Sequence, residues 1–317
     1  MREQGAMEHG RLTERTMASK EINQGAPAFP GRIELGHEQR RTEASCAKVN
    51  DPEHGLFAVT EGGGDPRVAA LVSRELALSI ARELGEAFDL EMENNAQGPG
   101  SVHERVARMD ALASAKLKDL FLSAVAKIRA RSVLTKEFAH ARMGASVAKR
   151  IDLPDGRRRL YVAHLGDARV YVLRDAHLTQ LTQDDTGLVQ QREAGLLTPE
   201  SYREIDQAHD PSLLTPEQQQ MFPLRNDVAW VTGDNVMRMT PDADLYTVLP
   251  GDRLVIVNGG VQRNLTERDM LHWLETVSDD LEAEDALQRA SDDQAGAKRT
   301  RLSRAQAEDL AAVVYTI

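Results

Sequence analysis

The sequence predicts an α+β protein in which antiparallel strands combine with long amphipathic helices. The clearest strand signal is Leu160–Leu181, where apolar residues alternate over Leu160–Leu165 and Arg169–Leu173 around the turn Gly166-Asp167-Ala168. Alternation with period 2 that is interrupted by a Gly-Asp pair is typical of an antiparallel meander. The clearest helix signal is Asp65–Met92, which carries apolar residues at the i, i+3/i+4 spacing of an amphipathic helix.

Composition and charge narrow the classes of partner. The net charge of −11 opposes binding to a phosphate backbone, and an aromatic content of 4% offers few surfaces for base stacking, so nucleic acid is not an expected partner. The single cysteine, Cys46, excludes a disulfide within the chain and favours a reducing compartment. No run approaches the ~20 apolar residues of a membrane span. We therefore expect a cytoplasmic protein without a membrane partner.

The N-terminal part of the chain begins with a polar segment. Residues 1–30 are charged and rich in Gly, which predicts a poorly ordered leader. Leu56–Val59 is a compact apolar strand, and it ends in the Gly-rich turn Glu61–Asp65. A Gly/Asn/Pro break at Asn94–Gly100 separates the first predicted helix from a second one.

The second helix opens with a capping box. Ser101 and Glu104 have the spacing at which each side chain satisfies a backbone N–H of the first turn. The apolar residues behind them continue at helical spacing as far as Ile128. The two helices are expected to be antiparallel and to form one layer against a sheet.

The C-terminal half returns to strands after a polar insertion. Residues 183–225 are too long for a simple connection, and we expect a flap of short helices there, because such segments are often lids or binding loops. A Pro-Gly-Asp turn precedes Arg253–Val257, a continuous apolar run that suits a buried strand. The remaining predicted elements are strands over Met143–Ile151, near Asp227–Val231 and near Ala243–Val248, a helix over Glu267–Val277 capped by Thr266, a charged helix over Glu282–Ala290 and a final strand in Asp309–Ile317.

Five of these segments, taken in order, resemble motifs of the PPM-type (2C-class) metal-dependent Ser/Thr protein phosphatases. The family's motifs are an acidic Asp-Gly-x-Gly-Gly turn, Met-Gly-Thr-Thr, Gly-Asp-Ser-Arg, Ser-Asp-Gly and Asp-Asn-Ile. The resemblance implies a PPM-type domain over residues 31–317. The matching segments are Leu56–Val59 with its Gly-rich turn, Met143–Ser146, Val162–Arg169, the strand that Gly251–Leu254 opens, and Glu308–Leu310.

The resemblance implies a four-layer α-β-β-α sandwich of two antiparallel sheets, flanked by antiparallel helix pairs. In the family, carboxylates at the edge of this sandwich hold two Mg²⁺ or Mn²⁺ ions, and a bridging water attacks the phosphate. Such hard cations need oxygen ligands in near-octahedral geometry, so the number and length of the carboxylates both matter.

Several positions that match the family's metal ligands are altered. Glu61 stands at the position of the bridging Asp and has a longer side chain, whereas Gly62 matches the glycine whose carbonyl oxygen helps to coordinate. Glu43 matches the Glu of an Asn-Glu-Asp motif but is followed by Ala44. Glu308 replaces the last metal-binding Asp. These residues are the candidate metal ligands, and Mg²⁺ or Mn²⁺ is the cofactor if one binds.

One ligand position is lost outright. Gly259 stands where the family has the Asp of Ser-Asp-Gly, and glycine has no side chain to coordinate a metal. The family's phosphate-binding arginine aligns with Gln39, so Arg40 and Arg41 are only neighbouring candidates, and one step along a strand reverses the face to which a side chain points.

The turn Gly166-Asp167 is explained by the residue types that form it. Gly-Asp pairs often mark turns, and Asp often bonds the backbone of its own turn. We therefore predict a structural role for Gly166 and Asp167 and assign no confident catalytic residue.

The altered ligands favour a catalytically impaired protein, a pseudophosphatase, that regulates a phosphoprotein or kinase pathway by binding a phosphorylated protein or a kinase. A single change to a metal ligand or to its support commonly costs ~10–100-fold in affinity or activity. The alternative is a divergent, slow metal-dependent phosphatase acting on phosphoserine or phosphothreonine. The charges of Glu43, Glu61 and Glu308 need compensation in either case, by a weakly bound ion or by nearby arginines.

Overall fold

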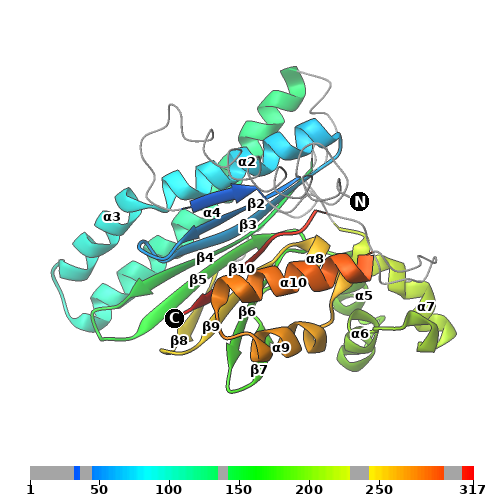
Figure 1. Cartoon of the computed structure of the whole chain (residues 1–317). Coiled ribbons are helices and arrows are strands. Elements are labelled where there is room, and N and C mark those ends of the chain that lie inside the picture. Colours follow the sequence, from blue (N-terminus) through cyan, green and yellow to red (C-terminus); the bar gives the residue numbers. More distant parts are fainter. Residues whose placement is uncertain (1–31, 36–44, 135–141, 229–242, 296–308) are drawn as a thin grey trace, which may run out of the picture.

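The computed structural model describes residues 32–35, 45–134, 142–228, 243–295 and 309–317, so the predicted leader lies outside the described residues. Within this part of the chain, two antiparallel sheets are stacked, and helices cover both outer faces (Figure 1). The predicted four-layer α-β-β-α sandwich is confirmed. None of the helices in the described part is long and apolar enough to cross a membrane.

The first sheet has the strand order β1-β2-β3-β4-β5-β8. All of its pairs are antiparallel, and β4 pairs with β3 on one side and with β5 on the other. Its strands are β1 (Arg32–Leu35), β2 (Cys46–Asp51), β3 (Leu56–Gly63), β4 (Arg142–Asp152), β5 (Arg158–Leu165) and β8 (Ala243–Val248).

The second sheet has the order β10-β9-β6-β7 and is also antiparallel. Its central strand β9 is buried along almost its whole length, as the apolar run in the sequence predicted. The strands are β6 (Arg169–Arg174), β7 (His177–Gln180), β9 (Arg253–Val257) and β10 (Ala312–Thr316).

The predicted meander is wrong in its first half. The alternating runs of β5 and β6 do not pair with each other, because β5 belongs to the first sheet and β6 to the second. The Gly166-Asp167 turn is therefore a crossing between the two sheets, and of the strands β5, β6 and β7 only β6 and β7 pair with each other. Both strands are buried on both faces, so alternation alone did not reveal which neighbour each one would find.

Helices α2 (Pro66–Glu83), α3 (Glu86–Gln97) and α4 (Val102–Leu134) cover the first sheet (Figure 1). The single helix predicted over Asp65–Met92 is wrong, because the chain breaks at Leu84 and Gly85 is the N-cap of α3. Phe88 and Met92 nevertheless stay in the same core as α2, so the apolar stripe continues across the break. The capping box at Ser101 and Glu104 is confirmed by hydrogen bonds in both directions.

The second sheet is covered by α8 (Gly259–Asn264), α9 (Glu267–Thr276) and α10 (Asp280–Ala295). Thr266 caps α9 as predicted, in a capping box with Asp269. The polar insertion forms a separate helical segment beside the sheets, visible at the lower right of Figure 1. It contains α5 (Gly187–Glu193), α6 (Pro199–Asp206), α7 (Pro216–Met221) and the 3₁₀ helices η3 (Pro211–Leu213) and η4 (Phe222–Asn226).

Gly62, near the end of β3, lies in backbone contact with α2. A Cβ atom at this position would lie 2.1 Å from the carbonyl oxygen and 2.8 Å from the Cα atom of Ala69. Backbone atoms of a packed helix cannot yield as a flexible side chain can, so the first turns of α2 approach β3 only because residue 62 is glycine.

We expect Gly62→Ala to lower the free energy of unfolding by about 3 kcal/mol, because the added methyl group forces α2 away from the sheet. Gly63→Ala is the matched control, since its Cβ would meet only the exposed Arg142 side chain, at 3.2 Å. The control should change stability by less than about 0.5 kcal/mol. Equal losses in the two variants, measured by denaturant unfolding, would contradict the close contact.

Candidate functional site

Four segments meet at one edge of the sandwich. Glu61 lies near the end of β3, opposite Gly144 of β4 in the strand register. The crossing turn at Gly166-Asp167 follows β5, and α8 begins at Gly259 directly after β9. The structure therefore brings together Glu61, Asp167 and Gly259, which are far apart in the sequence.

The Glu61 side chain is buried between two glycines. A Cβ atom at Gly144 would lie 2.8 Å from Glu61 Oε1, so glycine at 144 leaves the space that this carboxylate occupies. On the other side, the backbone N–H of Gly259 donates to Glu61 Oε2 at 3.4 Å. The residue is 6% exposed, so its charge is largely withdrawn from water.

Asp167 forms a buried ion pair with Arg263 of α8. Oδ2 of Asp167 accepts from Arg263 Nε at 2.8 Å and lies 2.5 Å from Arg263 Nη2. Gln262 Nε2 donates to the same oxygen at 2.9 Å. Asp167 is fully buried, and its side chain joins the crossing turn to α8. The predicted bond to the backbone of its own turn is not the interaction that the structure shows.

The turn itself is held by Asp185. The N–H of Gly166 donates to Asp185 Oδ2 at 2.9 Å, and the carbonyl oxygen of Gly166 accepts from the N–H of Asp185 at 2.8 Å. Gly166 has φ +90°, a conformation that L side chains rarely adopt, so glycine is required there. The turn is therefore capped by a neighbouring segment, which leaves the Asp167 carboxylate for Arg263.

Asn258 and Asp309 form hydrogen bonds with backbone groups around this edge. Asn258 Oδ1 accepts from the N–H groups of Val261 and Ala311, and its Nδ2 donates to the carbonyl oxygen of Asp309. The Asp309 carboxylate accepts from both the N–H and the hydroxyl group of Ser45, at 2.7 and 2.6 Å. Asn258 thus caps α8 and ties it to β10.

Four predicted site residues lie outside the described residues. These are Glu43, Glu308, Arg40 and Arg41. Gly62 belongs to the edge through its backbone, and its N–H donates to the carbonyl oxygen of Ser45 at 2.7 Å. Arg263, in contrast, is a central residue of the edge that the sequence analysis missed. The only local signal for it was its position four residues after Gly259, one turn along a helix.

Comparisons with known proteins support one fold. No family model matches the chain. A segment of 118 residues, 37% of the chain, is 30% identical to the Ser/Thr protein phosphatase PstP of Mycobacterium tuberculosis and spans only 19% of that protein. The crystal structure of PstP superimposes with a TM-score of 0.62 at 17% identity, covering 90% of this chain and 96% of that chain.

Two further structures agree. The PstP catalytic domain in complex with two manganese ions has a TM-score of 0.59 at 18% identity and covers 90% of this chain and 95% of that chain. The PPM Ser/Thr phosphatase MsPP of Mycobacterium smegmatis, in complex with cacodylate, has a TM-score of 0.52 at 18% identity over 91% of this chain and 98% of that chain. The chain has the PPM phosphatase fold.

The edge of the sandwich at which Glu61, Asp167 and Gly259 meet is called the PPM edge below. Its described part does not suit a two-metal centre. Divalent cations need several oxygen ligands with available charge. Here the Asp167 carboxylate is already paired with a guanidinium group, and Gly259 contributes only a backbone N–H. Within the described residues, no three His, Cys, Asp or Glu side chains gather as a ligand group. Glu61 and Asp167 alone therefore do not form the family's site.

A second buried ion network joins the PPM sandwich to the helical segment at 183–225. Arg169 of β6 donates to Asp184 from Nε and Nη2, at 2.9 and 2.6 Å, and to Asp206 from Nη2 at 2.8 Å. Burial alone would lower the pKa of Arg169, but the two carboxylates hold its pKa well above the usual range. The segment also has a small apolar core of its own, formed by Leu188, Ile205 and Phe222.

Arg225 extends this network toward the edge. Its Nε lies 3.5 Å from Asp206 Oδ1, and its guanidinium group lies over the Phe222 ring, 5.3 Å from the centroid. Among the described residues, none of its three guanidinium nitrogens has a hydrogen-bond partner. Burial and the positive charges of Arg169 and Arg263 lower the pKa of Arg225, although Asp206 opposes the shift.

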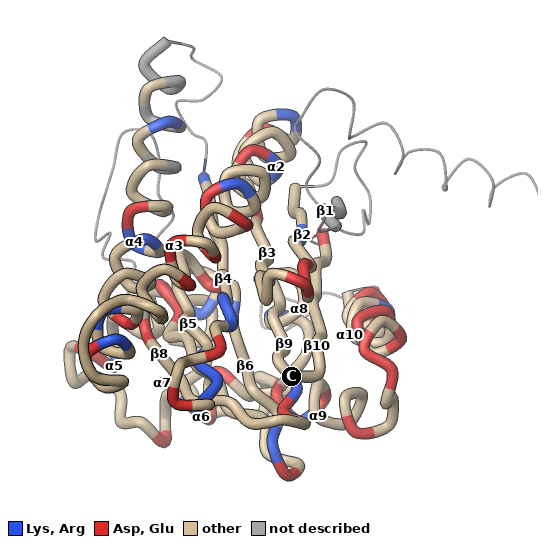
Figure 2. The backbone as a smooth tube through the Cα atoms, turned by 90° about the vertical axis from the view of Figure 1, so that its left-hand side faces the viewer, with Lys and Arg blue, Asp and Glu red and all other residues tan. Residues whose placement is uncertain are grey.

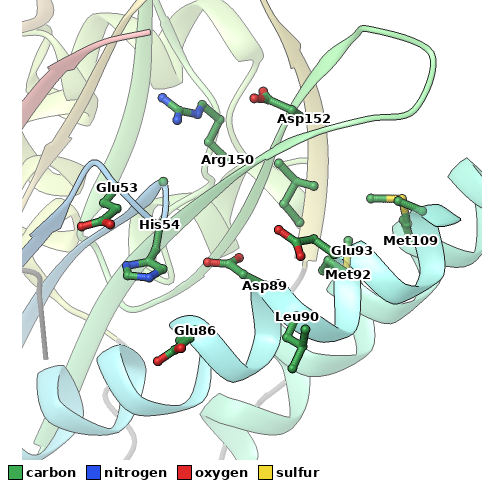
Figure 3. Close-up of a pocket in the computed structure, with 13 residues that line it drawn as sticks. Glu53, His54, Glu86, Asp89, Leu90, Met92, Glu93, Met109, Arg150 and Asp152 are labelled. Carbon is green, nitrogen blue, oxygen red and sulfur yellow. The ribbon is translucent and has the colours of Figure 1, made fainter. Parts of the chain in front are cut away.

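A cavity lies at the other end of the first sheet. It has a volume of about 530 Å³ and is lined by the β2–β3 turn, α3 and the end of β4 (Figure 3). Leu56, where β3 begins, is about 17 Å along the strand from Glu61 at 3.4 Å per residue. At the cavity, Asp89 Oδ1 lies 2.6 Å from the Nζ of buried Lys149, which holds α3 on the sheet. The cavity is thus separate from the PPM edge.

We expect Arg169→Met to lower the free energy of unfolding by about 3–5 kcal/mol, because Asp184 and Asp206 would stay buried without their guanidinium partner. Limited proteolysis should then cut within residues 183–225 before it cuts the sheets. Arg158→Ala is the matched control, since its ion pair with Asp152 is exposed and should be worth at most about 1 kcal/mol. A variant with wild-type stability and protease resistance would show that the network does not hold this segment.

Proposed function

We propose that this protein uses the PPM phosphatase fold to recognise a phosphorylated protein or a kinase of the same pathway, with the two-metal phosphatase reaction impaired. The names of its relatives support the class of partner, since PstP and MsPP are named as Ser/Thr phosphatases. The chain spans about a fifth of the length of the curated relative that it matches, so a role for this chain is inferred from its own edge.

The geometry at residue 259 carries this proposal. Gly259 offers no carboxylate, and a side chain there would begin 3.0 Å from Asp167 Oδ2 and 2.9 Å from Arg263 Nη2. A cation that belongs to the protein thus occupies the space beside Asp167 where a further metal ligand would have to enter. Loss of one ligand together with pairing of another carboxylate removes most of the charge that a two-metal reaction needs.

Exposed arginines on the α2 side of the edge favour the approach of an anionic group there. Arg142, at the start of β4, and Arg67, in the first turn of α2, are both exposed near the Gly63 turn. Figure 2 shows mainly acidic positions along α10, whereas α2 carries both signs. A phosphate group would therefore approach the α2 side of the edge, where an arginine can bind it with charge-assisted hydrogen bonds.

The proposed function predicts slow phosphatase turnover. At millimolar Mn²⁺, the protein should hydrolyse p-nitrophenyl phosphate and a phosphothreonine peptide at least about 100-fold more slowly than the PstP catalytic domain assayed in parallel, because ligand changes alone commonly cost 10–100-fold each. Turnover comparable with PstP, dependent on Mn²⁺ and lost in Glu61→Ala, would instead support the alternative, a divergent metal-dependent phosphatase.

The proposed function also predicts that the protein binds phosphorylated peptides. Fluorescence polarisation with phosphoserine and phosphothreonine peptides should show tighter binding than with their unphosphorylated forms, and Arg142→Glu should weaken binding about 10-fold, equivalent to roughly 1.4 kcal/mol. Arg158→Glu is the matched control, because Arg158 is a partly exposed arginine at the start of β5, paired in register with Asp152 at the far end of β4. Equal losses in the two variants would place the phosphate elsewhere.

A further inference from the structure

Arg263 occupies a central position among the buried groups of the edge. Its guanidinium group makes two close contacts with Asp167 Oδ2, and both residues are buried, at 6% and 0% exposure. A buried carboxylate is costly without a partner, and a guanidinium group, which is always charged, is well suited to that role. The protein therefore supplies a positive charge to this carboxylate from its own chain.

Gly259 makes the position of this guanidinium group possible. An added Cβ at 259 would lie 2.9 Å from Arg263 Nη2 and 3.0 Å from Arg263 Cζ, closer than real Cβ contacts. Gly259 and Arg263 are four residues apart in α8, so they lie on the same side of the helix. A side chain at residue 259 and the observed guanidinium group thus exclude each other.

We propose that Arg263 is the resident cation of this edge and takes the place of a divalent ion, so that Mg²⁺ or Mn²⁺ adds nothing to the stability of the wild-type protein. The same geometry makes the edge a latent metal site. Removal of the guanidinium charge leaves Asp167 without its ion-pair partner, beside a glycine whose N–H contacts the Glu61 carboxylate. The inference rests on the proposed function in one respect, since both exclude a two-metal centre in the native protein.

The test compares the unfolding temperature, Tm, in EDTA with that in millimolar MnCl₂. The wild-type Tm should be the same in both solutions. Arg263→Ala should have a lower Tm in EDTA, and Mn²⁺ should recover about 2–6 °C, because an ion that binds only the folded state stabilises it by mass action and 1 kcal/mol shifts Tm by about 2–4 °C for a protein of this size. Calorimetric titration with MnCl₂ should detect binding only in the variant.

Further variants separate loss of charge from loss of packing. Arg263→Gln keeps an amide donor but removes the charge, so it should also become responsive to Mn²⁺, whereas Arg263→Lys keeps the charge and should not. Gly259→Ala should act in the same direction as Arg263→Gln but more weakly, because it only displaces the guanidinium group. Arg253→Ala is the matched control, since Arg253 is a half-buried arginine paired with Asp280 away from this edge, and its lower Tm should not respond to Mn²⁺.

Two outcomes would overturn the inference. One is a wild-type Tm that rises with Mn²⁺ as much as that of Arg263→Ala, and the other is an Arg263→Gln variant that folds but neither binds Mn²⁺ nor gains stability from it. These results are distinct from failure of the proposed function. A wild-type protein that binds Mn²⁺ without turnover contradicts only the resident cation, whereas turnover that persists in EDTA contradicts only the impaired reaction.

Discussion

The Glu61 and Asp167 carboxylates are both buried at one edge of the sandwich. This burial constrains which residues can surround them. A charge withdrawn from water must be paired and hydrogen-bonded, because the desolvation cost otherwise exceeds any gain from packing. Arg263 pairs with Asp167, the N–H of Gly259 faces Glu61, and Gly144 leaves the volume that Glu61 fills. Two glycines and one arginine thus accommodate two buried carboxylates.

The same principle joins the helical segment at 183–225 to the sandwich. Arg169, two residues after Asp167, lies between Asp184 and Asp206, so the crossing turn and the start of β6 bind two different parts of the molecule. The crossing turn is consequently held from three sides: by α8 through Arg263, by Asp185, and by the Arg169 network. A turn fixed in this way is a structural part of the edge.

The fold could be predicted from the sequence because its strongest signals are local. The buried run of β9, the capping boxes at Ser101 and Thr266, and the stripe that α2 and α3 share are all consequences of neighbouring residues. The predictions that failed concern strand pairing, which depends on residues far apart in the chain, and a helix break across which the apolar spacing continues. Alternation in β5 and β6 is the same whether they pair or separate, and an apolar stripe does not show that Gly85 interrupts the helix.

The sequence by itself determined the α+β class, the order of the phosphatase-like motifs and the missing side chain at Gly259. It left open whether an ion or an arginine compensates the acidic residues, and Arg263 was not recognised. Only the tertiary structure decided that Arg263 faces Asp167, a residue 96 positions earlier in the chain. The reason is physical: a missing ligand is a property of one position, whereas a counter-charge depends on how α8, the crossing turn and β3 pack together. The Gly166-Asp167 turn, which the sequence predicts within an antiparallel meander, is the point at which those elements meet.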